Sequence, residues 1–273
     1  MTLWVNGCLL PDDAEVIRAD DHGLVVGDGV FETMSVENGV PFALTRHLQR
    51  LHRSASGLGI VVDDDLVRQG IDAVLADRPD FVRLRVTVTG GPSPYGSDRG
   101  SAAPTVMVAT GPLSPWPPTT DVAIVPWTRN ERSATAGLKT TSYADNVVAL
   151  SWAKQRGAAE AMFANTRGEL CEGTGSNVFV ERDGRLVTPP LGSGCLAGIT
   201  RELLLEWLPG EIDESSLPLG ALAESREAFI TSSTRGVMPI RAVDGVALAE
   251  APGPLTRRAA EVFFERAAAD PDP

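Results

Sequence analysis

Lysine is scarce in this sequence, and its scarcity draws attention to one position. Of the 24 basic side chains only Lys139 and Lys154 are lysines, and the others are arginines. An arginine can replace a lysine at most solvated positions, but its guanidinium stays protonated and cannot act as an amine nucleophile. Lys139 stands in "AGLKTTSYADN", close to Tyr143, whereas Lys154 in "WAKQRG" reads as a solvated helix end. A lysine in a Ser/Thr-rich turn is usually just exposed, yet the scarcity favours a chemical role for Lys139.

A carboxylate and several anion-binding groups follow further along the chain. Glu172 in "CEGTGSNVF" precedes a glycine-rich turn and an apolar strand. If that stretch is buried, the acid needs a cationic partner, and a protonated ring nitrogen would serve. A helix expected to begin near Ile199 and Thr200 has unpaired N–H groups that favour phosphate. Hydroxyls at Ser233 and Thr234 in "ITSSTRG" and an arginine of "TRHLQRLHRS" could add further donors.

Each of these segments also has an ordinary structural explanation as a turn, a solvated strand edge or a loop. "GSGCLA" loosely matches a dinucleotide-binding fingerprint, but Pro189 and Pro190 interrupt the strand that should precede it. Taken together, a reactive amine, a carboxylate and three phosphate contacts match what pyridoxal phosphate (PLP) requires of a protein. A nucleotide-binding or scaffold protein is the non-enzyme alternative.

The pattern of the chain predicts the elements that position these groups. In the first half, "NG" at 6–7 and at 38–39 predicts two hairpins. Thr45 is expected to cap one helix, and the acidic run Asp63–Asp65 to begin another. Residues 81–89 and 104–109 are typical of neighbouring strands.

The second half follows a proline-rich segment, "TGPLSPWPPTTD", which breaks every periodicity. We place the domain boundary there: an N-terminal domain at 1–112, a linker at 113–120 and a C-terminal domain at 121–273. Helices are expected near 143–156, 200–207 and 255–269, with a hairpin around Asp183-Gly184 and a disordered tail "DPDP".

Composition restricts the class of protein. A net charge of −12 argues against nonspecific binding to nucleic acid or an anionic membrane. No apolar run is long enough to span a bilayer, and the N-terminus does not read as a signal peptide. Cys8, Cys171 and Cys195 suggest neither a disulfide framework nor a zinc site. We therefore expect a cytoplasmic protein with no metal, nucleic-acid or membrane partner.

Six segments, in this order and spacing, resemble the fold-type IV (class IV) PLP enzymes. They are "DHGLVVGDGVFETMSVENG", "HLQRL", "LKTTSY", "CEGTGSNVF", "GITR" and "ITSSTRGVMPI". This family includes branched-chain aminotransferases, D-amino-acid aminotransferases and 4-amino-4-deoxychorismate lyases. The resemblance implies an α+β, two-domain fold with a smaller N-terminal α/β domain and a larger C-terminal mixed β domain. It also implies pyridoxal 5'-phosphate as cofactor and a homodimer.

The resemblance also implies a role for particular residues. Lys139 matches the catalytic lysine that forms a Schiff base with PLP and then moves the substrate proton. Glu172 matches the carboxylate that bonds the pyridine nitrogen. The other matched positions are Arg50, Ile199, Thr200, Ser233 and Thr234 around the phosphate, Leu196 on the ring face and Tyr143 at the phenolic oxygen.

The substrate side stays open between two activities. Arg83 aligns with an arginine of branched-chain enzymes and with a basic residue of the lyases, and Phe31 stands where D-amino-acid enzymes usually have tyrosine. The carboxylate-binding arginine and histidine of the latter have no clear match; Tyr95 is the nearest candidate, and Arg99 or Arg235 could substitute. "KTxSY" resembles the lyases, and "EGTGSNVF" favours the aminotransferases. We expect transfer of an amino group between a D-amino or branched-chain amino acid and a 2-oxo acid; the alternative is aminodeoxychorismate lyase.

Overall fold

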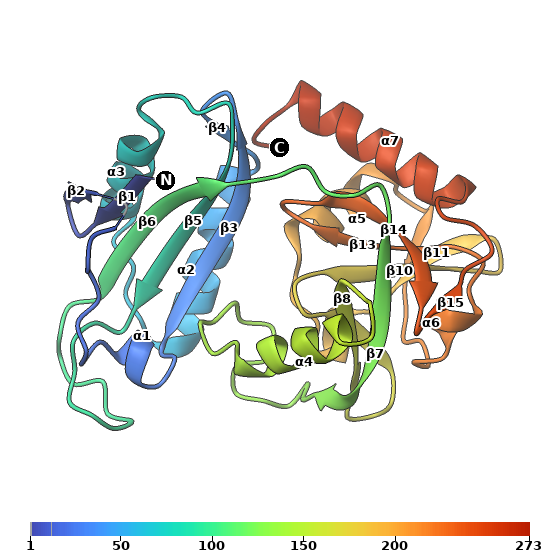
Figure 1. Cartoon of the computed structure of the whole chain (residues 1–273), viewed down its shortest axis with the longest axis horizontal. Helices are drawn as coiled ribbons and strands as arrows, with labels where there is room; N and C mark the ends of the chain where they lie inside the picture. Colours follow the sequence, from blue (N-terminus) through green and yellow to red (C-terminus); the bar gives the residue numbers. More distant parts are fainter. Residues whose placement is uncertain (1, 12) are drawn as a thin grey trace. The chain divides into compact units, whose positions relative to one another are not determined.

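The computed structural model describes residues 2–11 and 13–273, which form two compact units (Figure 1). The first unit contains the chain up to Ser114, together with Leu138–Tyr143 and Pro271–Pro273. The second contains Pro115–Gly137 and Ala144–Asp270. The expected domain limits at 112 and 121 stay a prediction. The division differs from them chiefly at Leu138–Tyr143, which carries Lys139 into the first unit.

The first unit is built on an antiparallel sheet with strand order β2-β1-β6-β5-β3-β4. Both predicted "NG" hairpins are confirmed: Asn6-Gly7 joins β1 to β2, and Asn38-Gly39 joins β3 to β4. All four of these residues have positive φ, the backbone that such tight turns require. The strands are β1 (Thr2–Val5), β2 (Cys8–Leu10), β3 (Gly29–Glu37), β4 (Val40–Pro41), β5 (Phe81–Thr89) and β6 (Thr105–Pro112).

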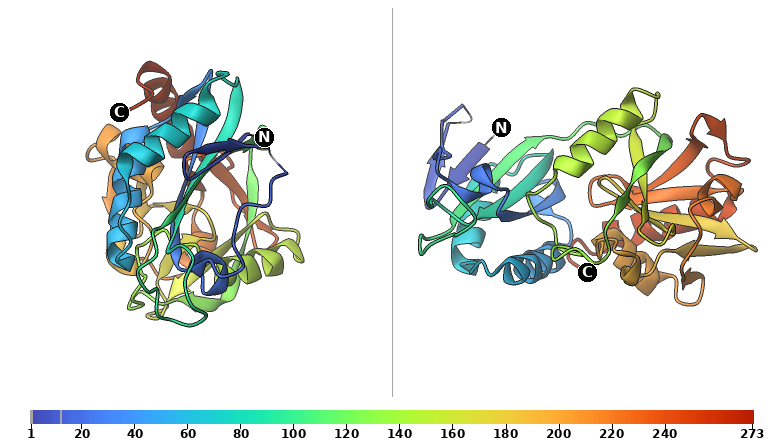
Figure 2. Two further views of the ribbon diagram at one scale, coloured as in Figure 1. Left: turned by 90° about the vertical axis from the view of Figure 1, so that its left-hand side faces the viewer. Right: turned by 90° about the horizontal axis from the view of Figure 1, so that it is seen from below.

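Two amphipathic helices, α2 (Leu44–Leu58) and α3 (Asp64–Leu75), pack on one side of this sheet (Figure 2). Alternation along β3 turns Val30, Met34 and Val36 into the core beneath the helices. Phe31 lies on the opposite face of the same strand. Asp63 caps α3 by accepting a hydrogen bond from the Leu66 N–H, as the acidic run predicted. A short helix, α1 (His22–Val25), precedes β3.

The start of α2 differs from the sequence-based expectation. Thr45 does not cap the helix; the N-cap is Ala43, which has left-handed backbone and no capping side chain. Asp272 supplies the missing acceptor, taking hydrogen bonds from the Thr45 N–H at 2.8 Å and its hydroxyl at 2.6 Å. The Pro271 carbonyl accepts from the Ala43 N–H. The prediction of a disordered tail was therefore wrong, because the tail satisfies orphan donors of a helix that the local sequence leaves uncapped.

The second unit contains a mixed nine-stranded sheet, ordered β12-β11-β10-β13-β14-β7-β8-β9 with β15 beside β14. The strands β14, β7 and β8 run parallel to one another, and most other pairs are antiparallel. These strands are β7 (Thr120–Arg129), β8 (Glu160–Asn165), β9 (Leu170–Gly173), β10 (Asn177–Arg182), β11 (Arg185–Thr188), β12 (Ile212–Glu214), β13 (Ala228–Ser232), β14 (Gly236–Val243) and β15 (Val246–Ala247).

Four helices and one 3₁₀ turn accompany that sheet. They are α4 (Ala144–Lys154), η1 (Leu191–Ser193), α5 (Ile199–Trp207), α6 (Ala221–Glu224) and α7 (Pro254–Ala269). The three predicted helices and the Asp183-Gly184 hairpin are confirmed within two residues at each end, and the mixed helix-and-sheet fold class is confirmed. Small residues let α4 approach the sheet: Ala149 and Ala153 pack on Ala123 and Phe163. None of the helices in the described part of the chain is both long and apolar enough to cross a membrane.

Candidate active site

The backbone of Lys139 is fixed by two neighbours within the first unit. Its carbonyl accepts a hydrogen bond from the Phe31 N–H of β3 at 3.1 Å. Its own N–H donates to the Ser54 hydroxyl of α2 at 3.0 Å. Thr141 continues this pairing by donating its N–H to the Gly29 carbonyl. The "LKTTSY" segment is thus laid along the edge of β3 as a short added strand, which holds the lysine at a defined place on the sheet.

The side chain of Lys139 lies among aromatic and basic groups that we name the lysine cluster: Phe31, Arg85, Lys139 and Tyr143. The Lys139 Nζ is 4.3 Å from the centroid of the Phe31 ring and 5.9 Å from that of Tyr143. The two rings meet edge to face at 5.2 Å. Rings at these distances orient the amine and keep water from part of its surroundings. Sequence reasoning identified three of the four members and missed Arg85.

Arg50 lies on α2, one helical turn before Ser54, and therefore on the face that carries the Lys139 backbone. The guanidinium is buried, and it donates to both oxygens of Glu32, from Nε at 2.8 Å and from Nη2 at 2.7 Å. Burial alone would raise the pKa of Glu32, but the charge and hydrogen bonds of Arg50, with help from His47, hold that pKa well below its usual range. Glu32 is therefore an ionised carboxylate that fixes the direction of Arg50.

His47 completes this buried group, and its burial determines its protonation. Burial lowers the pKa of His47, and the charges of Arg50 and Lys139 lower it further, against the opposing pull of Glu32. A neutral ring then donates from Nδ1 to Glu32 at 2.6 Å. Its Nε2 has no hydrogen-bond partner among the described residues. Neither Glu32 nor His47 was singled out from the sequence, because an acid in a strand and a histidine in a helix carry no local sign of pairing.

In the second unit, Glu172 is held between two groups. Its side chain is 13% exposed, and Oε2 accepts the Leu196 N–H at 2.8 Å. Oε1 lies 3.3 Å from Nε of Arg129, an ion-pair distance, and this guanidinium rests over the Phe163 ring. The sequence analysis requires a cationic partner for Glu172 if this residue is buried. Within the second unit, Arg129 is such a partner. That residue lies at the end of β7, and nothing in the local sequence connects it with Glu172.

Two of the residues expected to bind phosphate, Ile199 and Thr200, lie at the start of α5 in the second unit. This helix follows Gly198 and has no side-chain cap, so its first N–H groups are not satisfied by a local side chain. Thr200 is 1% exposed, and its hydroxyl has no hydrogen-bond partner in the described chain. A buried orphan hydroxyl at an uncapped helix start is what an anion site provides.

A second set of contacts connects the start of α5 with the hydroxyl turn. Asn177 donates to the Leu196 carbonyl at 2.8 Å and pairs in register with Thr231 of β13. The turn that follows β13 carries Ser233 and Thr234. Gly198 is required at this point, because a Cβ there would lie 1.8 Å from the Asn177 side-chain oxygen. Glu172, Leu196 and Asn177 are thus joined by consecutive hydrogen bonds, and Asn177 pairs with the strand that leads into this turn.

The residues proposed for the substrate side have different surroundings. Arg83 lies exposed on the face of the sheet opposite the helices, two residues from Arg85 on β5. Arg235 forms an ion pair with the buried Glu160 and lies over the Trp116 ring, so its charge is neutralised within its own unit. Tyr95 is 75% exposed in the loop between β5 and β6.

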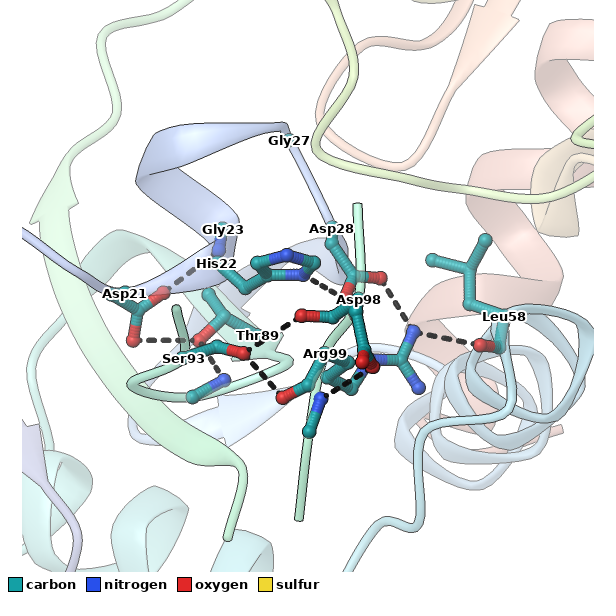
Figure 3. Close-up of polar contacts among 12 residues, drawn as sticks. Asp21, His22, Gly23, Gly27, Asp28, Leu58, Thr89, Ser93, Asp98 and Arg99 are labelled. Atoms are coloured by element: carbon teal, nitrogen blue, oxygen red, sulfur yellow. Dashed lines mark hydrogen bonds and ion pairs between the residues drawn. The ribbon is translucent and has the colours of Figure 1, made fainter. Parts of the chain in front are cut away.

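The loop that contains Tyr95 is anchored by a polar cluster around His22 (Figure 3). The buried His22 ring lies 2.7 Å from Asp28 through Nδ1 and 2.8 Å from the Gly96 carbonyl through Nε2. Arg99 donates to both oxygens of Asp28 and to the Leu58 carbonyl. Arg99 therefore serves to anchor its own loop. A carbonyl can only accept, so both ring nitrogens donate when His22 carries its charge, and the hydrogen bond to Asp28 raises the pKa of His22.

We predict that this cluster makes stability fall as the pH rises above neutrality. Because the folded-state pKa of His22 is raised above its unfolded value, the stabilisation is complete below about pH 6.5 and is lost as the pH rises through the folded pKa. Denaturant titrations from pH 5.5 to 9 should show the free energy of unfolding falling along this range. His22→Gln should flatten this dependence of the free energy of unfolding on pH. The control His52→Gln, which changes a half-exposed pair with Asp64, should leave the dependence unchanged. An unchanged slope in His22→Gln contradicts the prediction.

Comparison with known proteins identifies the family of the chain. Residues 29–243 match the family model "Amino-transferase class IV". The chain therefore belongs to the class IV aminotransferase family.

Individual relatives within that family have different activities. The chain is 28% identical to a putative branched-chain-amino-acid aminotransferase of Methanocaldococcus jannaschii (96% of this chain, 95% of the relative). It is 29% identical to the D-alanine aminotransferase of Bacillus licheniformis (94% of each) and to the aminodeoxychorismate lyase of Bacillus subtilis (89% and 87%). Among solved structures, the PLP-bound form of a hypothetical aminotransferase from Mycobacterium tuberculosis superimposes with a TM-score of 0.87 at 26% identity, over 99% of this chain and all of that one.

Proposed function

We propose that this class IV aminotransferase moves an amino group between an amino acid, of the D- or branched-chain type, and a 2-oxo acid, with PLP attached at Lys139. The observation that carries the proposal is the amine of Lys139, fixed at the edge of β3 with its Nζ 4.3 Å from the Phe31 ring. A lysine that served only as a solvated charge would not need its amine beside two aromatic rings.

The residues present suit PLP in each unit taken by itself. In the second, an acid flanked by a guanidinium, an uncapped helix and the orphan hydroxyl of Thr200 suit a pyridine nitrogen and a phosphate. In the first, the Lys139 amine suits the aldehyde, with Tyr143 beside it, and Arg50 suits the phosphate. When bound, PLP supplies an aldehyde that amines attack and a ring that accepts the electrons of a substrate carbanion.

The residues of the chain then have separate tasks. Lys139 would hold the cofactor covalently through its amine, and the same amine would take the proton from the substrate α-carbon. Glu172 would place a negative charge beside the ring nitrogen and so favour the protonated form of that nitrogen. In the second unit Leu196 would cover the ring, and Ile199, Thr200, Ser233 and Thr234 would bind the phosphate. In the first unit Arg50 would be a further phosphate ligand. Phe31 and Tyr143 orient the amine and exclude water.

A spectroscopic experiment tests the proposal. The purified protein with PLP should be yellow, and borohydride should fix the cofactor to Lys139, as mapped by mass spectrometry. Mixing it with single amino acids of each hand should then convert the absorption to that of the pyridoxamine form. A colourless protein, or cofactor found on Lys154, contradicts the proposal.

The second candidate activity is the lyase, favoured by the similarity to the Bacillus subtilis enzyme. It would use the same amine to expel pyruvate from aminodeoxychorismate and leave p-aminobenzoate. Inertness towards every amino acid, together with p-aminobenzoate formed from aminodeoxychorismate, would replace the first activity by this one.

Two further expectations from the resemblance belong to this proposal. We expect a homodimer, which light scattering of the purified protein would detect as twice the mass of one chain. We also expect a cytoplasmic location, which fractionation of the source cells would check.

A further inference from the structure

Arg85 is the member of the lysine cluster for which the sequence suggested no role. It lies on β5, two residues before Thr87, the register partner of Phe31. Its guanidinium carbon is 3.8 Å from the centroid of the same Phe31 ring that the Lys139 Nζ approaches at 4.3 Å. The guanidinium and the amine are therefore separated by no more than the sum of these two short distances.

The guanidinium of Arg85 keeps donors available for a ligand. Its Nε donates weakly to the Thr87 hydroxyl at 3.2 Å. Within residues 2–11 and 13–273, no carboxylate lies at ion-pair distance from Arg85, and no acceptor is bound to its Nη1 or Nη2. By contrast, Arg50, Arg99 and Arg235 are each neutralised by an acid. The Arg85 guanidinium is thus a positive charge that stacks on Phe31 and has no counter-ion among the residues that the structure describes.

The surroundings of Arg85 favour an anion over water. Desolvation lowers the pKa of Arg85, although the residue is exposed on its face of the sheet. The nearby charge of Arg83 acts in the same direction. A guanidinium remains charged nevertheless. A partly desolvated cation, stacked on an aromatic ring and near a second arginine, gains most from a planar, bidentate carboxylate.

We propose that Arg85 binds the α-carboxylate of the amino acid and 2-oxo acid substrates, an assignment that rests on the proposed function. Lys139 must reach the proton on the α-carbon at about 3 Å. The carboxylate carbon is one bond of about 1.5 Å further on, and charge-assisted contacts span about 2.8 Å. That reach agrees with the bound set by the two ring distances.

The proposal is tested first by binding, which needs no turnover. Propionate, the carboxylate of alanine without its amine, is titrated into the PLP-loaded protein and followed by calorimetry. Arg85→Met keeps the apolar stem on Phe31 and should weaken propionate binding by about 10- to 100-fold. Arg85→Lys should retain part of the propionate binding, because it keeps the positive charge. The rest should be lost, because an ammonium group cannot make the two parallel hydrogen bonds of a guanidinium. The control Arg53→Met, an exposed arginine of α2, should bind propionate as the unaltered protein does.

Kinetics then separates a carboxylate contact from a structural one. Arg85→Met should lose much more of its reaction with alanine than of the slow reaction with ethylamine, which has no carboxylate. Equal propionate binding in Arg85→Met, or a parallel loss of ethylamine reaction or PLP affinity, overturns the assignment. If no amino acid reacts with the unaltered protein while propionate binding still depends on Arg85, the proposed aminotransferase activity fails and the carboxylate site stands.

Discussion

Replacing Lys139 by alanine is expected to reduce turnover on the order of 10⁴-fold or more, since one amine both holds the cofactor and moves the proton. The fold should survive the change, because the Phe31 N–H and the Ser54 hydroxyl hold the backbone of residue 139 and not its side chain. PLP should still bind noncovalently, but borohydride should no longer attach it. Assays at high enzyme concentration measure the loss of turnover. A thermal unfolding curve measures whether the fold survives.

Two further variants identify what the amine contributes. Lys139→Arg keeps a positive charge on a long stem but removes an amine that can lose its proton, so it should be as inactive as Lys139→Ala. Lys154→Ala changes the only other lysine, which is exposed at the end of α4, and should leave turnover unchanged. Activity retained in Lys139→Arg, or lost in Lys154→Ala, would remove Lys139 from the reaction.

Local features of the sequence predicted the elements well. The hairpins at Asn6-Gly7 and Asn38-Gly39 follow from turn chemistry within four residues, and Asp63 caps α3 as a local acid does. Signals of this kind act over one turn, and the sequence displays them directly.

Contacts between distant segments could not be predicted in this way. Asp272 caps α2 from 227 residues away, and Arg129 reaches Glu172 only because β7, β8 and β9 are neighbours in the sheet. Arg85 joins Phe31 through the register of β3 with β5, and a slip of one residue would turn it to the other face. The sequence could therefore suggest which residues react, through scarcity and resemblance, but not which groups surround them.

Buried charge leads to the second large effect. Glu32→Gln is expected to destabilise the protein by about 3–5 kcal/mol, because it leaves the buried Arg50 guanidinium without its counter-ion. Urea titration measures this loss. Glu37→Gln, at the exposed end of the same strand, is the matched control and should change stability by less than about 0.5 kcal/mol. The double variant Glu32→Gln/Arg50→Met should recover part of the loss, since it removes the unpaired charge.

The pH dependence and phosphate provide independent tests of the same pair. Because the pKa of Glu32 is lowered in the folded state, its contribution is present above the unfolded value near 4.5 and is lost as the pH falls through the folded value. The unaltered protein should therefore lose stability more steeply in acid than Glu32→Gln. Inorganic phosphate should stabilise Glu32→Gln more than the unaltered protein, because an anion can then take the place of the lost carboxylate beside Arg50. Equal stabilisation by phosphate in both proteins would contradict this replacement of the carboxylate by an anion.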